Sequence, residues 1–126
     1  MVKFGKEPFL ECSSRGDKRL SAFFAYVNGK SIENTYQAAK KFADGSHSLT
    51  PKEAKLKQQT VQILNMEECK TLYVRLWRRY FAQNPELLKE LVEGEYNGFS
   101  DMFGQQGHMC QAEEIYKIVT EQRENL

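Results

Sequence analysis

The sequence has few cysteines and no long apolar segment. Its three cysteines, Cys12, Cys69 and Cys110, are far apart, and they form neither a CxxC pair nor, with His47 and His108, a metal-ligand spacing. We therefore expect free thiols in a reducing compartment and no metal site. No apolar run approaches the roughly 20 residues that a membrane helix needs, so no membrane partner is expected. The N-terminal segment has no apolar block of the kind found in signal peptides, which predicts a cytoplasmic protein.

An excess of charge of one sign is also missing. The chain carries 18 Lys and Arg against 17 Asp and Glu, a formal net charge of +1. This balance argues against a protein that binds nucleic acid by bulk charge, although a nucleic-acid substrate at a small local site remains compatible with it. The 126 residues, 40% of them hydrophobic, can build one core. We predict a single domain over residues 1–126, and the oligomeric state is left open.

The predicted fold class is mainly α, more fully α+β, with a small β element near the N-terminus. Residues 21–27 are rich in aromatic and β-compatible side chains, and Asn28-Gly29 after them favours a tight hairpin. Capping patterns at Ser31, at Thr50-Pro51, at Asn65 and at Asn84 open the predicted helices. These helices span about residues 32–43, 51–64, 66–82, 85–92 and 108–122. The four glycines of residues 93–107 predict a loop there.

The first predicted helix carries a polar stripe beside its apolar side. Glu33, Gln37 and Lys40 follow one another at i, i+4 and i+7, while Tyr36 belongs to the apolar side. The pattern alone is typical of a solvated Glu/Lys face. A functional role for the stripe requires support beyond periodicity.

Two further segments are candidates for a site. Asp101 lies among apolar residues and glycines in the 98–104 segment, either carried toward an enclosed site with Phe103 or capping its own loop. Arg15 and Lys18 belong to a basic segment that offers donors to a diphosphate or forms an ordinary charged surface loop.

Several segments together resemble the NADAR family, also called YbiA-like proteins. The most specific is Glu33-Asn34-Thr35-Tyr36-Gln37-Ala38-Ala39-Lys40, which is similar to the "E..YQA.K" helix start of that family. Weaker similarities lie at residues 21–24, 50–55, 80–87 and 100–104. The similar segments keep the order of the family across about residues 20–107.

The resemblance implies a mainly helical N-glycosidase of NAD and ADP-ribose metabolism. Such an enzyme cleaves a ribosyl–nitrogen bond, for example removing ADP-ribose from a nucleobase, or acts on a nucleotide or on ADP-ribosylated nucleic acid. Glu33 becomes the expected catalytic carboxylate, because such a group can stabilise the cationic sugar and deprotonate the attacking water. Asp101 is the expected second acid, which binds a ribose hydroxyl or assists proton transfer to the departing base.

The mechanism hypothesis also assigns expected substrate contacts. Gln37 and Lys40 would bind polar substrate groups, and Arg15 and Lys18 would hold phosphates. Phe103 or Tyr36 would stack on the base. No metal or cofactor is required by this chemistry.

The chain departs from the family pattern at Met66, Tyr80 and Phe103. If groups lost there were catalytic, the protein would be a non-catalytic module that binds ADP-ribose or a NAD-derived signal. An interaction protein without a ligand is the remaining alternative.

Overall fold

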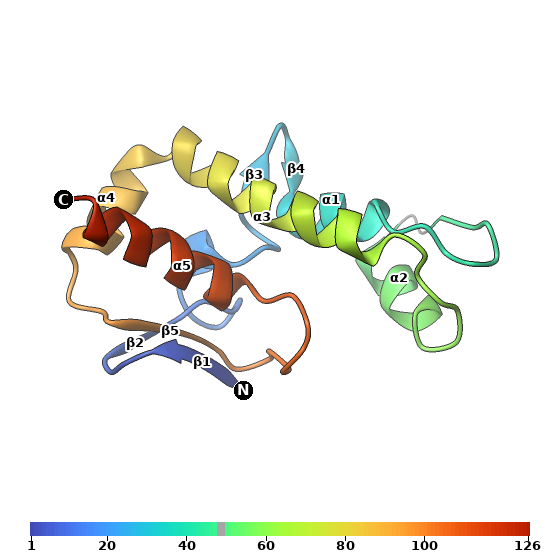
Figure 1. Ribbon diagram of the computed structural model, residues 1–126, viewed down its shortest axis with the longest axis horizontal. Helices are drawn as coiled ribbons and strands as arrows, with labels where there is room; N and C mark the ends of the chain where they lie inside the picture. Colours follow the sequence, from blue (N-terminus) through green and yellow to red (C-terminus); the bar gives the residue numbers. More distant parts are fainter. Residues whose placement is uncertain (48–49) are drawn as a thin grey trace.

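The computed structural model describes residues 1–47 and 50–126, and its described part is an α+β domain (Figure 1). In the larger sheet, β5 (Gly98–Asp101) lies between β1 (Val2–Gly5) and β2 (Phe9–Glu11). It runs antiparallel to β1 and parallel to β2. A separate hairpin joins β3 (Tyr26–Val27) to β4 (Lys30–Ser31). The predicted hairpin near the N-terminus is therefore present, and the separate three-stranded sheet includes a strand from the C-terminal part of the chain.

Helices predominate over strands. The helices are α1 (Ile32–Ala38), α2 (Pro51–Lys57), α3 (Met66–Gln83), α4 (Pro85–Glu93) and α5 (Gln111–Glu124), with a short 3-10 turn at Lys18–Leu20. Helices cover 47% of the structure and strands 14%, so the prediction of a mainly helical α+β fold is confirmed. In Figure 1, α5 lies between the sheet and α3, and α2 lies at the far end from the sheet. No helix in the described residues is both long and apolar enough to cross a membrane.

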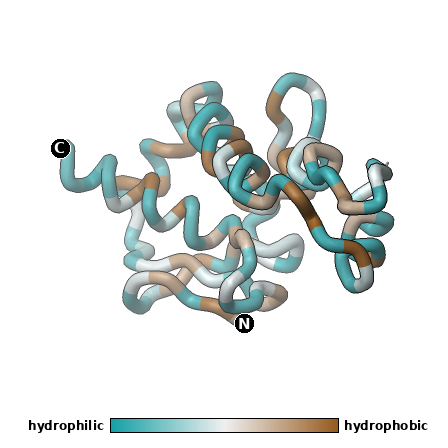
Figure 2. The backbone as a smooth tube through the Cα atoms, turned by 45° about the vertical axis from the view of Figure 1, so that its right-hand side comes forward, coloured by the Kyte–Doolittle hydropathy of each residue, from teal (hydrophilic) through white to brown (hydrophobic). Residues whose placement is uncertain are grey.

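The core lies where α3 and α5 meet above the sheet. Trp77 of α3 is fully buried, and Phe99 of β5 and Ile115 of α5 belong to the same hydrophobic cluster. Figure 2 shows hydrophilic and hydrophobic residues alternating along these helices, as expected for helices with one face on a core. The three cysteines are buried and unpaired, in agreement with the expected free thiols.

Several elements lie where the local sequence patterns predict them. Helices α3 and α4 match the predicted ranges within about one residue. Ser31 and Thr50 cap α1 and α2 as expected, each accepting a hydrogen bond from a backbone N–H of the first turn. Asn28 and Gly29 have φ of 54° and 81°, which confirms the tight hairpin turn.

The first predicted helix is shorter than expected, because α1 ends at Ala38 and not near residue 43. Phe42 forms an isolated antiparallel bridge with Ile63, and the backbone N–H groups of Ala43 and Leu64 donate to Gln62 and Lys41. This long-range pairing removes residues 41–43 from the helix. It also explains why α2 stops at Lys57 and not near residue 64.

The predicted cap at Asn65 is wrong in detail. Its side chain makes no capping bond to α3 and instead accepts from the N–H of Lys41 and donates to the carbonyl of Ala39. The amide therefore links the start of α3 to the chain that follows α1.

Three other boundaries also differ from the prediction. The loop expected at 93–107 contains β5, since residues 98–101 pair with β1 and β2. In residues 21–27, N–H groups of Phe24 and Ala25 donate to the carbonyl of Ser21, so a turn precedes the two-residue strand β3. Helix α5 begins at Gln111, three residues later than expected.

Candidate functional site

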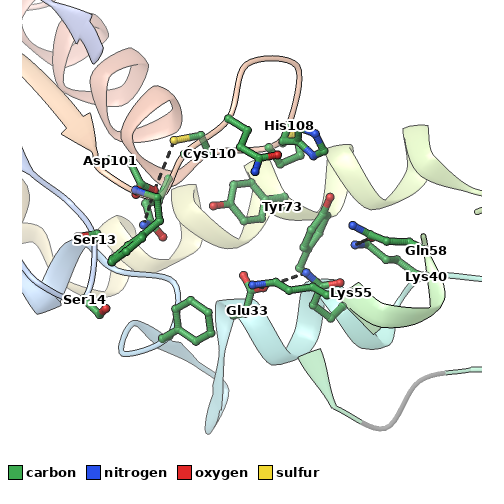
Figure 3. A pocket seen from close by; sticks show the side chains of 18 of the residues that line it. Ser13, Ser14, Glu33, Lys40, Lys55, Gln58, Tyr73, Asp101, His108 and Cys110 are labelled. Carbon is green, nitrogen blue, oxygen red and sulfur yellow. Dashed lines mark hydrogen bonds and ion pairs between the residues drawn. The ribbon is translucent and has the colours of Figure 1, made fainter. Parts of the chain in front are cut away.

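A cavity of about 500 Å³ opens between α1, α2, the chain after β2 and the loop after β5 (Figure 3). Of the residues predicted for a site, it is lined by Glu33, Asp101, Tyr36, Gln37, Lys40 and Phe103. The two carboxylates come from distant parts of the chain and are brought to one cavity by the fold. In Figure 3, Glu33 and Asp101 come from opposite walls, α1 and β5.

Glu33 is fixed in the first turn of α1 and is only 8% exposed. Gln37, one helical turn later, donates from Nε2 to Glu33 Oε1 at 2.9 Å. Lys55 of α2 brings its Nζ to 3.9 Å from the same oxygen. These contacts orient the Glu33 carboxylate and place a positive charge beside it.

Lys40 continues the polar stripe two residues beyond the end of α1. It is only 3% exposed, and its Nζ donates to Gln58 Oε1 at 2.8 Å. The same ammonium lies 4.9 Å from the centre of the Tyr36 ring. Burial lowers the pKa of Lys40, and the opposing charge of Glu33 only partly offsets that effect.

The Tyr36 side chain is largely used within the protein. Its ring meets the Tyr73 ring edge-on with centroids 4.9 Å apart, and its hydroxyl donates to Met66 Sδ at 3.9 Å. Burial raises its pKa to about 12. Tyr36 therefore forms part of the cavity wall, and its ring and hydroxyl already contact Tyr73, Lys40 and Met66.

Asp101 is 6% exposed and accepts three hydrogen bonds from the protein. The donors are the N–H of Phe103 at 2.9 Å, Gln111 Nε2 at 2.8 Å and Cys110 Sγ at 3.7 Å. Gln111 also accepts from the N–H of Ala22, which ties α5 to the turn before β3. Because a carboxylate offers about four acceptor positions, one remains for an outside donor. The loop-capping role and a role in the cavity are therefore compatible.

Phe103 follows Asp101 in the loop, lines the cavity and is 61% exposed. Phe23 lines the cavity as well and is about half exposed, with Lys55 Nζ 5.3 Å from its ring centre. An exposed aromatic ring beside a polar cavity is suited to stack on a flat ligand group.

Arg15 and Lys18 do not line the cavity. Hydrogen bonds from Gly16 N–H to Ser13 O and from Asp17 N–H to Glu11 O turn this segment, so that Ser13 and Ser14 face the cavity instead. Both basic side chains are exposed, and Lys18 Nζ lies over the Phe24 ring at 5.2 Å from its centre. The phosphate role expected for them has no support in the geometry.

Sequence reasoning missed several lining residues, among them Ser13, Ser14, Lys55, Gln58, Tyr73, His108 and Gln111. Only Lys55 and Gln58 had a signal, since their spacing places them on one face of the capped helix that starts after Thr50 and on its continuation. The others become neighbours only through tertiary contacts.

The cavity offers neither a metal centre nor an activated thiol. In the described parts of the chain, no group of three His, Cys, Asp or Glu residues has the geometry to hold a metal ion. Burial raises the pKa of the Cys110 thiol to about 11, which disfavours the nucleophilic thiolate.

A scan of the chain against models of protein families found no match, and a search of curated proteins found none either.

Proposed function

We propose that the protein is an N-glycosidase that hydrolyses a ribosyl–nitrogen bond in an ADP-ribose-type or nucleotide substrate, as a compact member of the NADAR family. The observation that carries this proposal is the cavity itself. It combines a buried, oriented carboxylate at Glu33 with a second carboxylate at Asp101 and an exposed aromatic ring at Phe103. The resemblance of residues 33–40 to the family motif supports the same reaction class.

In this mechanism, the bond between the anomeric carbon and the nitrogen breaks, and its electron pair leaves with the base. Positive charge then develops on the ribose. The Glu33 carboxylate stabilises that charge and accepts a proton from the water whose oxygen bonds to the anomeric carbon. Gln37 keeps the carboxylate oriented toward the cavity through its 2.9 Å hydrogen bond. The departing base takes up a proton from solvent or from a neighbouring donor.

Asp101 is proposed to bind a ribose hydroxyl. Three of its acceptor positions are occupied by Phe103, Cys110 and Gln111, and one is free for a hydroxyl donor. Phe103, two residues after Asp101, would then stack on the base.

The test is Glu33→Gln, read by mass spectrometry on ADP-ribosylated guanine in DNA, ADP-ribosylated protein, NAD and aminopyrimidine ribosides. We expect the variant to fold and to lose at least about 100-fold of turnover on the substrate that the wild type cleaves, the scale of a general base. Glu86→Gln is the control, because Glu86 also lies in the first turn of a helix but is exposed. Near-normal turnover in Glu33→Gln would remove Glu33 from the mechanism. A wild type that binds ADP-ribose and cleaves nothing would instead support the non-catalytic binding module.

A further inference from the structure

Lys40 is a buried cation whose nearest polar partner is neutral. Its Nζ donates to the amide oxygen of Gln58, and no carboxylate of the described residues lies within 4.0 Å of it. A buried charge is costly unless an opposite charge or several hydrogen bonds compensate it. An ammonium has three donors, and one hydrogen bond leaves this site incompletely satisfied.

A second cation faces the same end of the cavity. Lys55 and Gln58 are one helical turn apart at α2 and its C-cap, and both line the cavity together with Lys40. Lys55 is half exposed and reaches toward Glu33 Oε1 at 3.9 Å. Two ammonium groups here meet one carboxylate, so this end of the cavity has a surplus of positive charge.

The opposite end differs in character. Figure 3 shows Asp101 and Ser13 on one side of the cavity and Lys40 with Gln58 on the other, with Glu33 between them in this view. The charge of Asp101 is already met by donors of its own surroundings. The cavity is therefore polarised, and an anionic group fits only the lysine end.

We propose that Lys40, Lys55 and Gln58 form a subsite for a phosphate group of the ligand. The two ammonium groups supply charge, and Gln58 Nε2 is left to donate because its oxygen accepts from Lys40. A phosphate bound there places the attached ribose next to Glu33 and the base toward Asp101 and Phe103. The identity of the ribose and base rests on the proposed function, whereas the phosphate subsite does not.

The subsite is tested by calorimetric titration with two phosphate probes, ribose 5-phosphate and ADP-ribose, and with their neutral counterparts, ribose and adenosine. We expect at least one phosphate probe to bind more tightly than its neutral counterpart. We expect Lys55→Gln and Lys40→Met each to weaken its binding by about tenfold or more, the usual scale for a charged hydrogen bond. Lys52→Gln is the matched control, since Lys52 is an exposed lysine of the same helix outside the cavity.

The outcomes distinguish a phosphate monoester from a diphosphate ligand, and they test the phosphate subsite separately from the N-glycosidase activity. Preference for ribose 5-phosphate identifies a terminal monoester, and preference for ADP-ribose identifies a diphosphate. The subsite is overturned if neither phosphate probe binds the folded wild type, or if both lysine variants, shown to be folded by circular dichroism, bind like Lys52→Gln.

Glu33→Gln should bind the phosphate probe at least as tightly as the wild type, because it removes a negative charge 3.9 Å from Lys55. Loss of turnover therefore reports on the N-glycosidase, and loss of phosphate binding reports on the subsite.

Discussion

Glu11, at the end of β2, joins three segments around the cavity. Its carboxylate accepts from the N–H groups of Ser13 at 3.2 Å and Met102 at 2.9 Å and from Ser100 Oγ at 2.9 Å. Partial burial alone would raise the Glu11 pKa, but the hydrogen bonds together outweigh it and lower the pKa below its ordinary value of 4.5. Glu11 therefore fixes two segments that border the cavity, which are the chain from Ser13 onward and the loop that follows β5.

The lowered pKa predicts an acid-dependent loss of stability. A carboxylate whose pKa is lower in the folded state stabilises the fold above its unfolded pKa, and that contribution is lost as the pH falls through the folded value. We expect Glu11→Gln to reduce the free energy of unfolding at pH 7 by about 1.5–3 kcal/mol and to flatten its decline below pH ~4.5. Urea unfolding at pH 7 and pH 3 measures both effects. Glu95→Gln, at an exposed position of the loop before β5, should change neither, and an equal effect there would contradict the role of Glu11.

At the scale of elements, α1 depends on its N-terminal cap. Ser31 is the last residue of β4 and the N-cap of α1, and its Oγ accepts from the N–H of Asn34 at 3.1 Å. The helix has only seven residues, so one capping bond is a large part of what defines its start. Glu33 and Gln37 both lie on this helix, and their geometry depends on it.

We expect Ser31→Ala to lower the free energy of unfolding by about 1 kcal/mol, because the Asn34 N–H loses its acceptor. Ser31→Gly should cost only a few tenths of a kcal/mol, since glycine is tolerated at this capping position. Chemical denaturation of the two variants beside the wild type checks the order. A larger loss for Ser31→Gly than for Ser31→Ala would mean that packing of the buried Ser31 side chain, and not capping, dominates.

At the scale of the whole molecule, α2 lies far from the sheet, while Trp77 lies in the core that joins α3 to α5 and the sheet (Figure 1). The cavity lies between these two parts, since its lining includes residues of both α2 and the β5 loop. A functional site of this kind requires both parts to fold together.

We therefore predict one cooperative unfolding transition for the chain. Trp77, the single tryptophan, is fully buried, and its fluorescence reports on the core, whereas far-ultraviolet circular dichroism reports on all helices. The two denaturation curves should coincide, as they do for a two-state domain. An earlier change in circular dichroism alone would show that part of the helical structure unfolds independently of the core.

In the candidate site, the polar stripe that begins at Glu33 on α1 could be predicted from the sequence. The residues of other elements that contact this stripe could not. Glu33 and Gln37 share a helix face because of their spacing alone, and all predicted site residues except Arg15 and Lys18 line the cavity. The partners of Glu33 and Lys40, on α2 and at its C-cap, follow from how two helices pack. That packing depends on the pairing of residues 41–43 with 62–64, which no local pattern reveals.

Features that depend on neighbours within about one helical turn follow from the local sequence alone. These are the caps at Ser31 and Thr50, the long amphipathic helix α3 and the turn at Asn28. The remaining features depend on tertiary contacts, because strand pairing and packing join segments far apart in the chain. Strand β5 is recognisable only beside β1 and β2, at the other end of the sequence, and that pairing carries Asp101 to the cavity that Glu33 lines.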